Sequence, residues 1–319
     1  MKDFKSKFAP VIIEYLEHRE TLRYSTCHEV SLALFDAYCF EHHPNIETLT
    51  KEVVRGWVNY ETSRGRGGMY NIISAIRLLA QYVGNGSYIL PTTAVAKRPV
   101  SVPYILTDDE LSRLFFAADN LKSSCNPFLK LIFPTLLRLM YTCGLRPHEV
   151  RLIKRDNINF STGEILIDKA KRHKERIVVM SDDMLKQCRK YDLVRTASSI
   201  QSKYFFPRSD GECVKYQQLI NLYKRCWTQA NPDIPANILP KLTPYSLRHR
   251  FASAILQKWL SEKRDFYAML PYLRAFMGHE KFSDTAYYIH LLPENLLCSP
   301  GVDWSIIDDM TPEVNVWES

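Results

Sequence analysis

Residues 142–150 read TCGLRPHEV and follow the apolar stretch FLKLIFPTLLRLMY of residues 128–141, which has the spacing of a helix. Gly144 is expected to end that helix, and Pro147, which is tolerated at the first position of a helix, to start the next one. Arg146 then stands at a tight turn, beside the free backbone N–H groups of a helix start, which favour an anion. Most arginines are ordinary surface charges, so Arg146 is a functional candidate only in combination with other motifs of the chain.

Beyond this turn the hydrophobic period changes. Residues 163–181 read GEILIDKAKRHKERIVVMS, in which two short apolar runs flank a polar, basic tip. This pattern predicts a β-hairpin. Helical patterns return at residues 182–194, 213–229, 246–260, 266–278 and 283–292. The sequence therefore predicts a mainly α fold with one small β-hairpin, an α+β class.

The first hundred residues predict a separate helical domain. Apolar positions with helical spacing occur at residues 8–18, 29–43, 50–61 and 69–84. Prolines at 91, 99 and 103 then suit an extended linker, and Thr107, followed by three acidic residues, looks like a new helix start. We expect four parts: a helical domain, a linker, a second domain and an acidic tail, at residues 1–98, 99–106, 107–291 and 292–319.

Composition and charge narrow the function. The 319 residues are 46% hydrophobic and 24% charged, and no apolar run reaches the ~18 residues of a membrane helix. Glutamates interrupt the apolar positions near the amino terminus, so we expect a cytoplasmic protein. The net charge is +7, but residues 282–319 hold seven acids and no lysine or arginine, so the rest of the chain carries +14. Such a balance favours a polyanion partner, although a solvated basic surface would give the same total.

Five short motifs occur in a specific order: TCGLRPHEV, the hairpin DKAKRHKERIVV, LRH at 247–249, MGH at 277–279, and Tyr288 nine residues after His279. Together they resemble the tyrosine recombinase (phage integrase) family from about Thr107 to Leu291. The first hundred residues look like the core-binding domain of that family. The resemblance implies a C-shaped clamp around double-stranded DNA, and strand cleavage and rejoining without a metal or another cofactor.

The resemblance also assigns roles to individual residues. Arg146 and Arg248 would clamp the scissile phosphate, because a guanidinium fork donates two parallel hydrogen bonds to phosphate. Glu149 would support Arg146, and His279 would hydrogen-bond the phosphate. Tyr288 would attack phosphorus and form a 3′-phosphotyrosyl bond that keeps the energy needed for rejoining.

The hairpin would supply the proton for the departing 5′ oxygen. Lys171 matches the first lysine of the family pattern GKGNKER, and Lys174-Glu175-Arg176 matches its KER. Lys169 and Lys174 remain alternatives to Lys171, and a solvated lysine-rich turn is an equally good interpretation of each lysine. Lys174 is also a candidate DNA contact.

Tyr245 and the adjacent tyrosines Tyr287 and Tyr288 leave two questions open, the identity of the general base and that of the nucleophile. The family usually has histidine three residues before the second arginine, where this chain has Tyr245, a poor base at neutral pH. Tyr245 is therefore a site residue whose replacement leaves the general base unidentified, and His249 is interpreted as a structural histidine of the core. Of the adjacent tyrosines, spacing favours Tyr288 as nucleophile, and Tyr287 is expected to pack in the core.

DNA contacts of the first domain are expected from Arg64, Arg66 and Arg77. The resemblance implies a homo-oligomer on DNA, a dimer on each site and a tetramer in synapsis, in the cytoplasm at the nucleoid. The tail, residues 292–319, would dock on a neighbouring protomer or fold back on its own chain. Two alternatives stay open within this fold: a DNA-binding protein with weakened catalysis, and a monomeric relaxing enzyme similar to type IB topoisomerases. A metal-dependent nuclease would need clustered carboxylates, and no such motif is evident.

Overall fold

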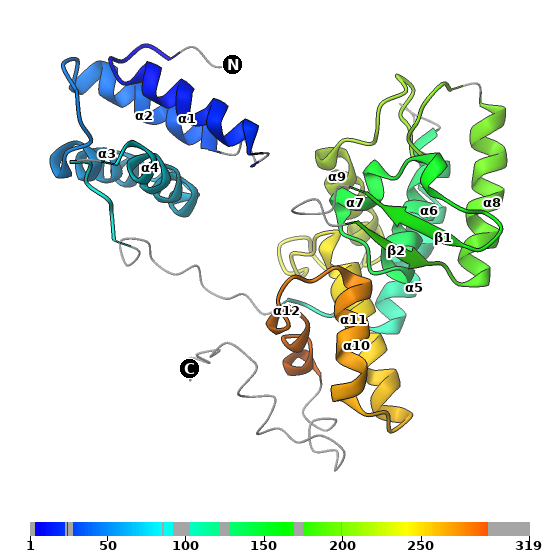
Figure 1. The fold of residues 1–319 in the computed structure, drawn as a ribbon. Coiled ribbons are helices and arrows are strands. Elements are labelled where there is room, and N and C mark those ends of the chain that lie inside the picture. Colours follow the sequence, from blue (N-terminus) through cyan, green and yellow to red (C-terminus); the bar gives the residue numbers. More distant parts are fainter. Residues whose placement is uncertain are drawn as a thin grey trace. The chain divides into compact units, whose positions relative to one another are not determined.

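The chain folds into two compact units, Met1–Val100 and Ser101–Ser319, each with its own hydrophobic core (Figure 1). The computed structural model describes residues 4–22, 24, 28–84, 86–91, 103–121, 128–168, 175–198 and 200–292. The predicted tail falls almost wholly outside these residues, as does part of the predicted linker.

The described residues of the first unit form four α-helices: α1 (Ala9–Thr21), α2 (Glu29–His42), α3 (Lys51–Ser63) and α4 (Met69–Val83) (Figure 1). Helix α4 packs against the other three. Phe35 and Trp57 are fully buried between the helices and meet edge to face, at 5.1 Å between ring centroids. Thr50 caps α3 by accepting from the backbone N–H of Val53, so the predicted helix start is confirmed.

The described part of the second unit is mainly helical and contains one two-stranded sheet (Figure 1). In chain order its elements are α5 (Asp108–Asp119), α6 (Phe128–Thr142), α7 (Pro147–Leu152), η3 (Arg155–Asn157), β1 (Glu164–Ile167), β2 (Arg176–Val179), α8 (Asp182–Ala197), α9 (Tyr216–Gln229), α10 (Tyr245–Ser261), α11 (Phe266–Met277), α12 (Ser283–Ala286) and η5 (Ile289–Leu291). Thr107 and Glu110 form a capping box at the start of α5. The mainly helical α+β fold class is confirmed.

Helix α6 is the centre of this unit. It packs against α5, α7, α8 and α10, and Leu136, Leu137, Leu139 and Met140 on it are fully buried. Burial of four such side chains contributes on the order of 1.5–3 kcal/mol each. The core therefore fixes the carboxyl end of α6, which leads directly into Arg146.

The predicted hairpin is present. Strands β1 and β2 pair antiparallel, with Glu164 opposite Val179 and Ile167 opposite Arg176. Strand β2 also packs against α11. The hairpin tip, residues 169–174, lies outside the described residues.

No helix in the described part of the chain combines the length and the hydropathy that a membrane span requires. The sequence has eight cysteines. Those at 39, 143, 188, 213 and 226 are free thiols.

Candidate active site

Two glycine turns form the base of the site. Gly144 follows α6 with a φ of +57°, and a Cβ there would lie 2.5 Å from the ring of Phe251. Gly278 follows α11 with a φ of +65°, and its Cβ would lie 2.9 Å from a guanidinium nitrogen of Arg176. Both positions require glycine, because the backbone is in the left-handed region and because a Cβ atom would clash with the neighbouring side chain.

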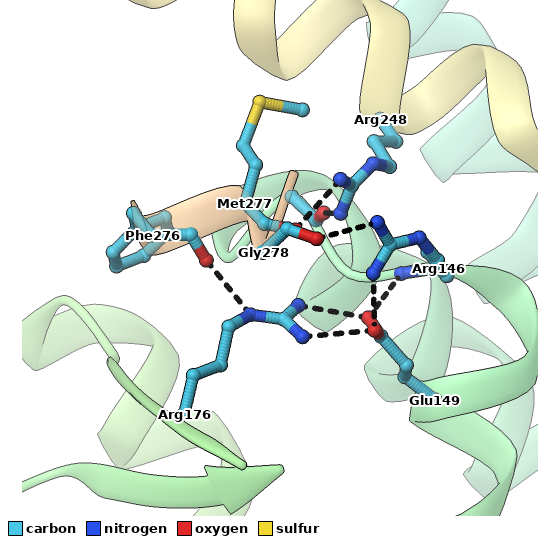
Figure 2. Close-up of polar contacts among 8 residues, drawn as sticks. Arg146, Glu149, Arg176, Arg248, Phe276, Met277 and Gly278 are labelled. Atoms are coloured by element: carbon cyan, nitrogen blue, oxygen red, sulfur yellow. Dashed lines mark hydrogen bonds and ion pairs between the residues drawn. The ribbon is translucent and has the colours of Figure 1, made fainter. Parts of the chain in front are cut away.

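The two arginines predicted to clamp a phosphate come together across these turns (Figure 2). Arg248 donates to the carbonyl oxygen of Gly144 at 2.5 Å and to that of Met277 at 2.7 Å. Arg146 donates to the carbonyl oxygen of Gly278 at 2.8 Å. Arg248 is 1% exposed, whereas the Arg146 side chain keeps 18% of its surface open. The carbonyl oxygens therefore fix two positive groups that come from distant parts of the chain.

Glu149 links Arg146 to a third arginine, Arg176 (Figure 2). Its carboxylate accepts from the Arg146 side chain at 2.7 Å and from both terminal nitrogens of Arg176 at 2.8 Å. Arg176 also donates to the carbonyl oxygen of Phe276. Burial alone would raise the pKa of Glu149, but the hydrogen bonds and charge of Arg176, aided by Arg146, outweigh it and lower the pKa to about 2. The sequence pointed to Arg176 only as part of the KER match, and did not indicate that this residue of β2 pairs with Glu149, the partner of Arg146.

Tyr288 lies between α12 and η5 and is 4% exposed. Its hydroxyl lies 3.1 Å from Nδ1 of His249, and its ring stacks on His279 with centroids 6.0 Å apart. Burial raises the pKa of Tyr288, and the positive charge of Arg248 offsets part of that rise. Tyr287 is only half-buried. The expectation that Tyr287 packs in the core is therefore wrong, since Tyr288 is the buried one of the two.

Both histidines beside Tyr288 are neutral at pH 7. Burial, followed by the charges of Arg248 and Arg146, lowers the pKa of His279 to about 3, and its Nδ1 lies 2.8 Å from the hydroxyl of Thr285. Burial and the charge of Arg248 lower the pKa of His249 to about 4. His249 is half-buried and its Nδ1 faces the Tyr288 hydroxyl, so the ring interpreted as a structural histidine lies directly beside the predicted nucleophile.

Arg248 and Tyr245 complete the α10 side of the site. Burial and the charge of Arg146 lower the pKa of Arg248 to about 10, so its guanidinium remains charged at neutral pH. Tyr245 is 37% exposed, and its ring centroid lies 5.9 Å from that of His249. The structure thus brings five predicted site residues into one region of the second unit, namely Arg146, Glu149, Arg248, His279 and Tyr288, with Tyr245 at its border.

The remaining predicted residues are elsewhere. Lys171 and Lys174, with the alternative Lys169, fall in the hairpin tip outside the described residues. The three arginines of the first unit that were predicted to contact DNA have different surroundings. Arg64 is exposed and donates to the Tyr60 hydroxyl. Arg66 pairs with the buried Glu61, and Arg77 donates to the Leu90 carbonyl oxygen. Among the described residues, no group of three or more His, Cys, Asp or Glu side chains is arranged to hold a metal ion.

Comparisons with known proteins show the family of the chain. The model of the phage integrase family matches residues 105–295. A Sinorhizobium fredii protein named as integrase/recombinase y4rE is 31% identical over 196 residues, 60% of this chain and 61% of that protein. The tyrosine recombinase XerD of Staphylococcus aureus is 24% identical over 82% of this chain and 85% of its own length.

Two solved structures share the fold. One is the XerH site-specific recombinase bound to its palindromic difH substrate, with a TM-score of 0.63, 17% identity, and coverage of 88% of this chain and 79% of that one. The other is the Tn1549 transposon integrase in complex with transposon right end DNA, with a TM-score of 0.63, 12% identity, and coverage of 87% and 94%. The family model spans more than half of the chain, and we conclude that the chain belongs to the phage integrase family of tyrosine recombinases.

Proposed function

We propose that the protein is a site-specific DNA recombinase that cleaves and rejoins strands through a 3′-phosphotyrosine intermediate, in integration, excision or transposition. Its family is one of enzymes that break and rejoin DNA strands. The observation that carries the proposal is the convergence of Arg146 and Arg248 on residues 277–278, beside Tyr288.

The chemistry follows from the charges. In-line attack on a phosphodiester adds negative charge to the non-bridging oxygens, and donors fixed beforehand stabilise that charge more than they stabilise the ground state. Arg146 and Arg248 supply such donors, and His279 supplies a neutral ring beside them. The oxygen of Tyr288 forms a bond to phosphorus while the bond from phosphorus to the 5′ oxygen breaks. Lys171 gives that oxygen its proton.

Rejoining reverses these steps. The phosphotyrosyl bond has about the energy of the phosphodiester it replaces, so a 5′ hydroxyl can attack it without ATP or another cofactor. Glu149 keeps Arg146 in place through both steps.

Double-stranded DNA is the proposed partner. Support comes from the charge of the chain outside its acidic end, and from relatives whose structures contain DNA. Residues 1–98 would act as the core-binding domain, which contacts DNA through Arg64, Arg66 and Arg77. Residues 107–291 would act as the catalytic domain, in which Lys174 contacts the DNA. The two domains would close around the duplex as a clamp. We further propose a dimer on each site and a tetramer in synapsis, joined through the tail after residue 292, and a location in the cytoplasm at the nucleoid.

A covalent adduct provides the test. Protein-bound DNA ends are first mapped in cells that express the chain, and a duplex of the mapped sequence with a nick beside the cleavage point is then incubated with the protein. The nick lets the short 5′-hydroxyl strand diffuse away, so the adduct accumulates. We expect an adduct with the wild type and none with Tyr288→Phe; an adduct formed by Tyr288→Phe would overturn the proposal.

The replacement at Tyr245 favours a second candidate, a DNA-binding protein of this fold with weakened catalysis. Specific binding to the mapped duplex without any adduct would identify it. A relaxing enzyme would instead remove supercoils from plasmids that lack the mapped site.

A further inference from the structure

We propose that His249 accepts the phenol proton of Tyr288 as the tyrosine attacks phosphorus. The inference rests on the proposed function and names a base for its first step. Nδ1 of His249 lies 3.1 Å from the Tyr288 hydroxyl, within hydrogen-bond reach, and the two ring centroids are 5.6 Å apart. His249 follows Arg248 on α10, so the residue that binds the phosphate and the residue that takes the proton share one rigid element.

The other groups around Tyr288 are less suited to this role. His279 stacks on the tyrosine with nearly parallel rings, and its Nδ1 is engaged by the Thr285 hydroxyl. Tyr245 carries a phenol hydroxyl, which is a poor proton acceptor at neutral pH. Arg248 and Arg146 are cations with no acceptor atom.

The proton state of His249 fits an acceptor. Its pKa is lowered to about 4, first by burial and then by the charge of Arg248, so the ring is neutral at pH 7. With the ring hydrogen on Nε2, the Nδ1 lone pair faces the phenol. The charged and titratable groups near His249 are Tyr245 and Arg248 on α10 and the Tyr288 hydroxyl. Arg146 and His279 lie near Tyr288. A bound phosphodiester anion would partly offset the two guanidinium charges and raise the pKa of His249 during the reaction.

The step balances. The phenol O–H bond breaks, its proton moves to Nδ1, and the oxygen lone pair forms the bond to phosphorus. The bond from phosphorus to the 5′ oxygen breaks, and that oxygen takes a proton from Lys171. In rejoining, the 5′ hydroxyl returns its proton to Lys171, and the imidazolium of His249 returns its proton to the phenolate leaving group.

The test compares His249→Asn and His249→Ala with the wild type, using single-turnover adduct formation on the nicked duplex of the mapped site from pH 6 to 9. Asparagine keeps a polar atom near the place of Nδ1 but cannot hold a proton. We expect both variants to lose about 10²- to 10⁴-fold at pH 7. Their rates should rise about tenfold per pH unit, as hydroxide takes over the deprotonation of a phenol whose pKa is raised by burial, while the wild type stays nearly flat.

His43→Ala is the matched control. It removes a histidine whose Nε2 lies 3.3 Å from the Tyr38 hydroxyl, in the first unit. Its rate and pH profile should equal those of the wild type. A wild-type rate for His249→Asn would overturn the inference and leave the proposed function intact. So would slow variants whose rates lack the steep pH dependence. Absence of an adduct from the wild type would overturn the proposed function and the inference with it.

Discussion

Arginines have different surroundings in the two units. In the second unit Arg248 is 1% exposed and bonded to two carbonyl oxygens, and Arg146 is held by a third carbonyl and by Glu149. In the first unit Arg64 stands in solvent at the end of α3 and donates to the hydroxyl of Tyr60 on the preceding turn.

Under the proposed function, this difference predicts that the buried arginines act in catalysis and the exposed arginine acts in DNA binding. A buried guanidinium fixed by carbonyls has little freedom to lose when phosphate arrives, and acts at low dielectric, so its effect is greatest where transition-state charge develops. An exposed arginine binds phosphate in the ground state, with an effect that salt screens. Substitutions in the first group should therefore lower the cleavage rate, and those in the second should lower affinity.

Among the substitutions that test this comparison of arginines, the largest loss of cleavage is expected for Arg248→Lys. Lysine keeps the charge but has no planar fork, so it cannot donate to both Gly144 and Met277 and still face a phosphate. We expect adduct formation at saturating DNA to fall by about 10²- to 10³-fold, with DNA affinity changed by only a few-fold. Arg250→Lys, at a buried arginine two residues on that pairs with Asp108, is the matched control. Equal losses in both variants would mean that α10 packing, and not the clamp, causes the defect.

Glu149→Gln comes next. It leaves the charges of Arg146 and Arg176 without their carboxylate, and breaking a buried pair costs about 3–5 kcal/mol. Because the pKa of Glu149 is about 2 in the folded protein, against an ordinary value of 4.5, its stabilising charge is fully present above pH 4.5 and is lost as the pH falls toward 2. Urea unfolding should show a large difference between wild type and variant at pH 7 and a smaller one at pH 3. An equal difference at both pH values would contradict this role of the Glu149 charge.

Local patterns in the sequence predicted much of the fold. Thr50 and Thr107 cap the helices they were expected to start, and the change from helical to alternating period marked the hairpin. These features depend on neighbours within a few residues, which is the range in which spacing determines structure. The motif order likewise predicted that Arg146 and Arg248 belong to one site.

Contacts between segments that are distant in the sequence could not be predicted from such local patterns. Nothing in the LRH motif indicates that the His249 ring meets a hydroxyl 39 residues later in the chain. The burial of Tyr288 and the partial exposure of Tyr287 depend on how the turn after α12 packs against α10, which spacing from His279 does not determine. Arg77 was grouped with the DNA contacts, although its guanidinium donates to the Leu90 carbonyl oxygen.

Tyr245→His is expected to change cleavage by less than tenfold, by retaining or raising the rate. Tyr245 lies one helical turn before His249 and is 37% exposed, so a smaller ring fits there. A histidine at this position adds a second group that can accept a proton near pH 7. The measurement is adduct formation on the nicked duplex at pH 7, and a tenfold or larger loss would show that the Tyr245 phenol itself is needed.

Arg64→Ala should have the smallest effect on catalysis. Its guanidinium is exposed and bonded only locally, so removing it should delete about one phosphate contact. The slope of log affinity against log salt should then become shallower by about 1, while the cleavage rate at saturating DNA stays within about twofold, since an exposed contact of this kind acts mainly on ground-state binding. Arg77→Ala should change that slope less, because the Leu90 carbonyl oxygen already occupies its guanidinium. If Arg64→Ala slowed cleavage at saturating DNA by tenfold, the first unit would also stabilise the transition state, and the division of roles between buried and exposed arginines would fail.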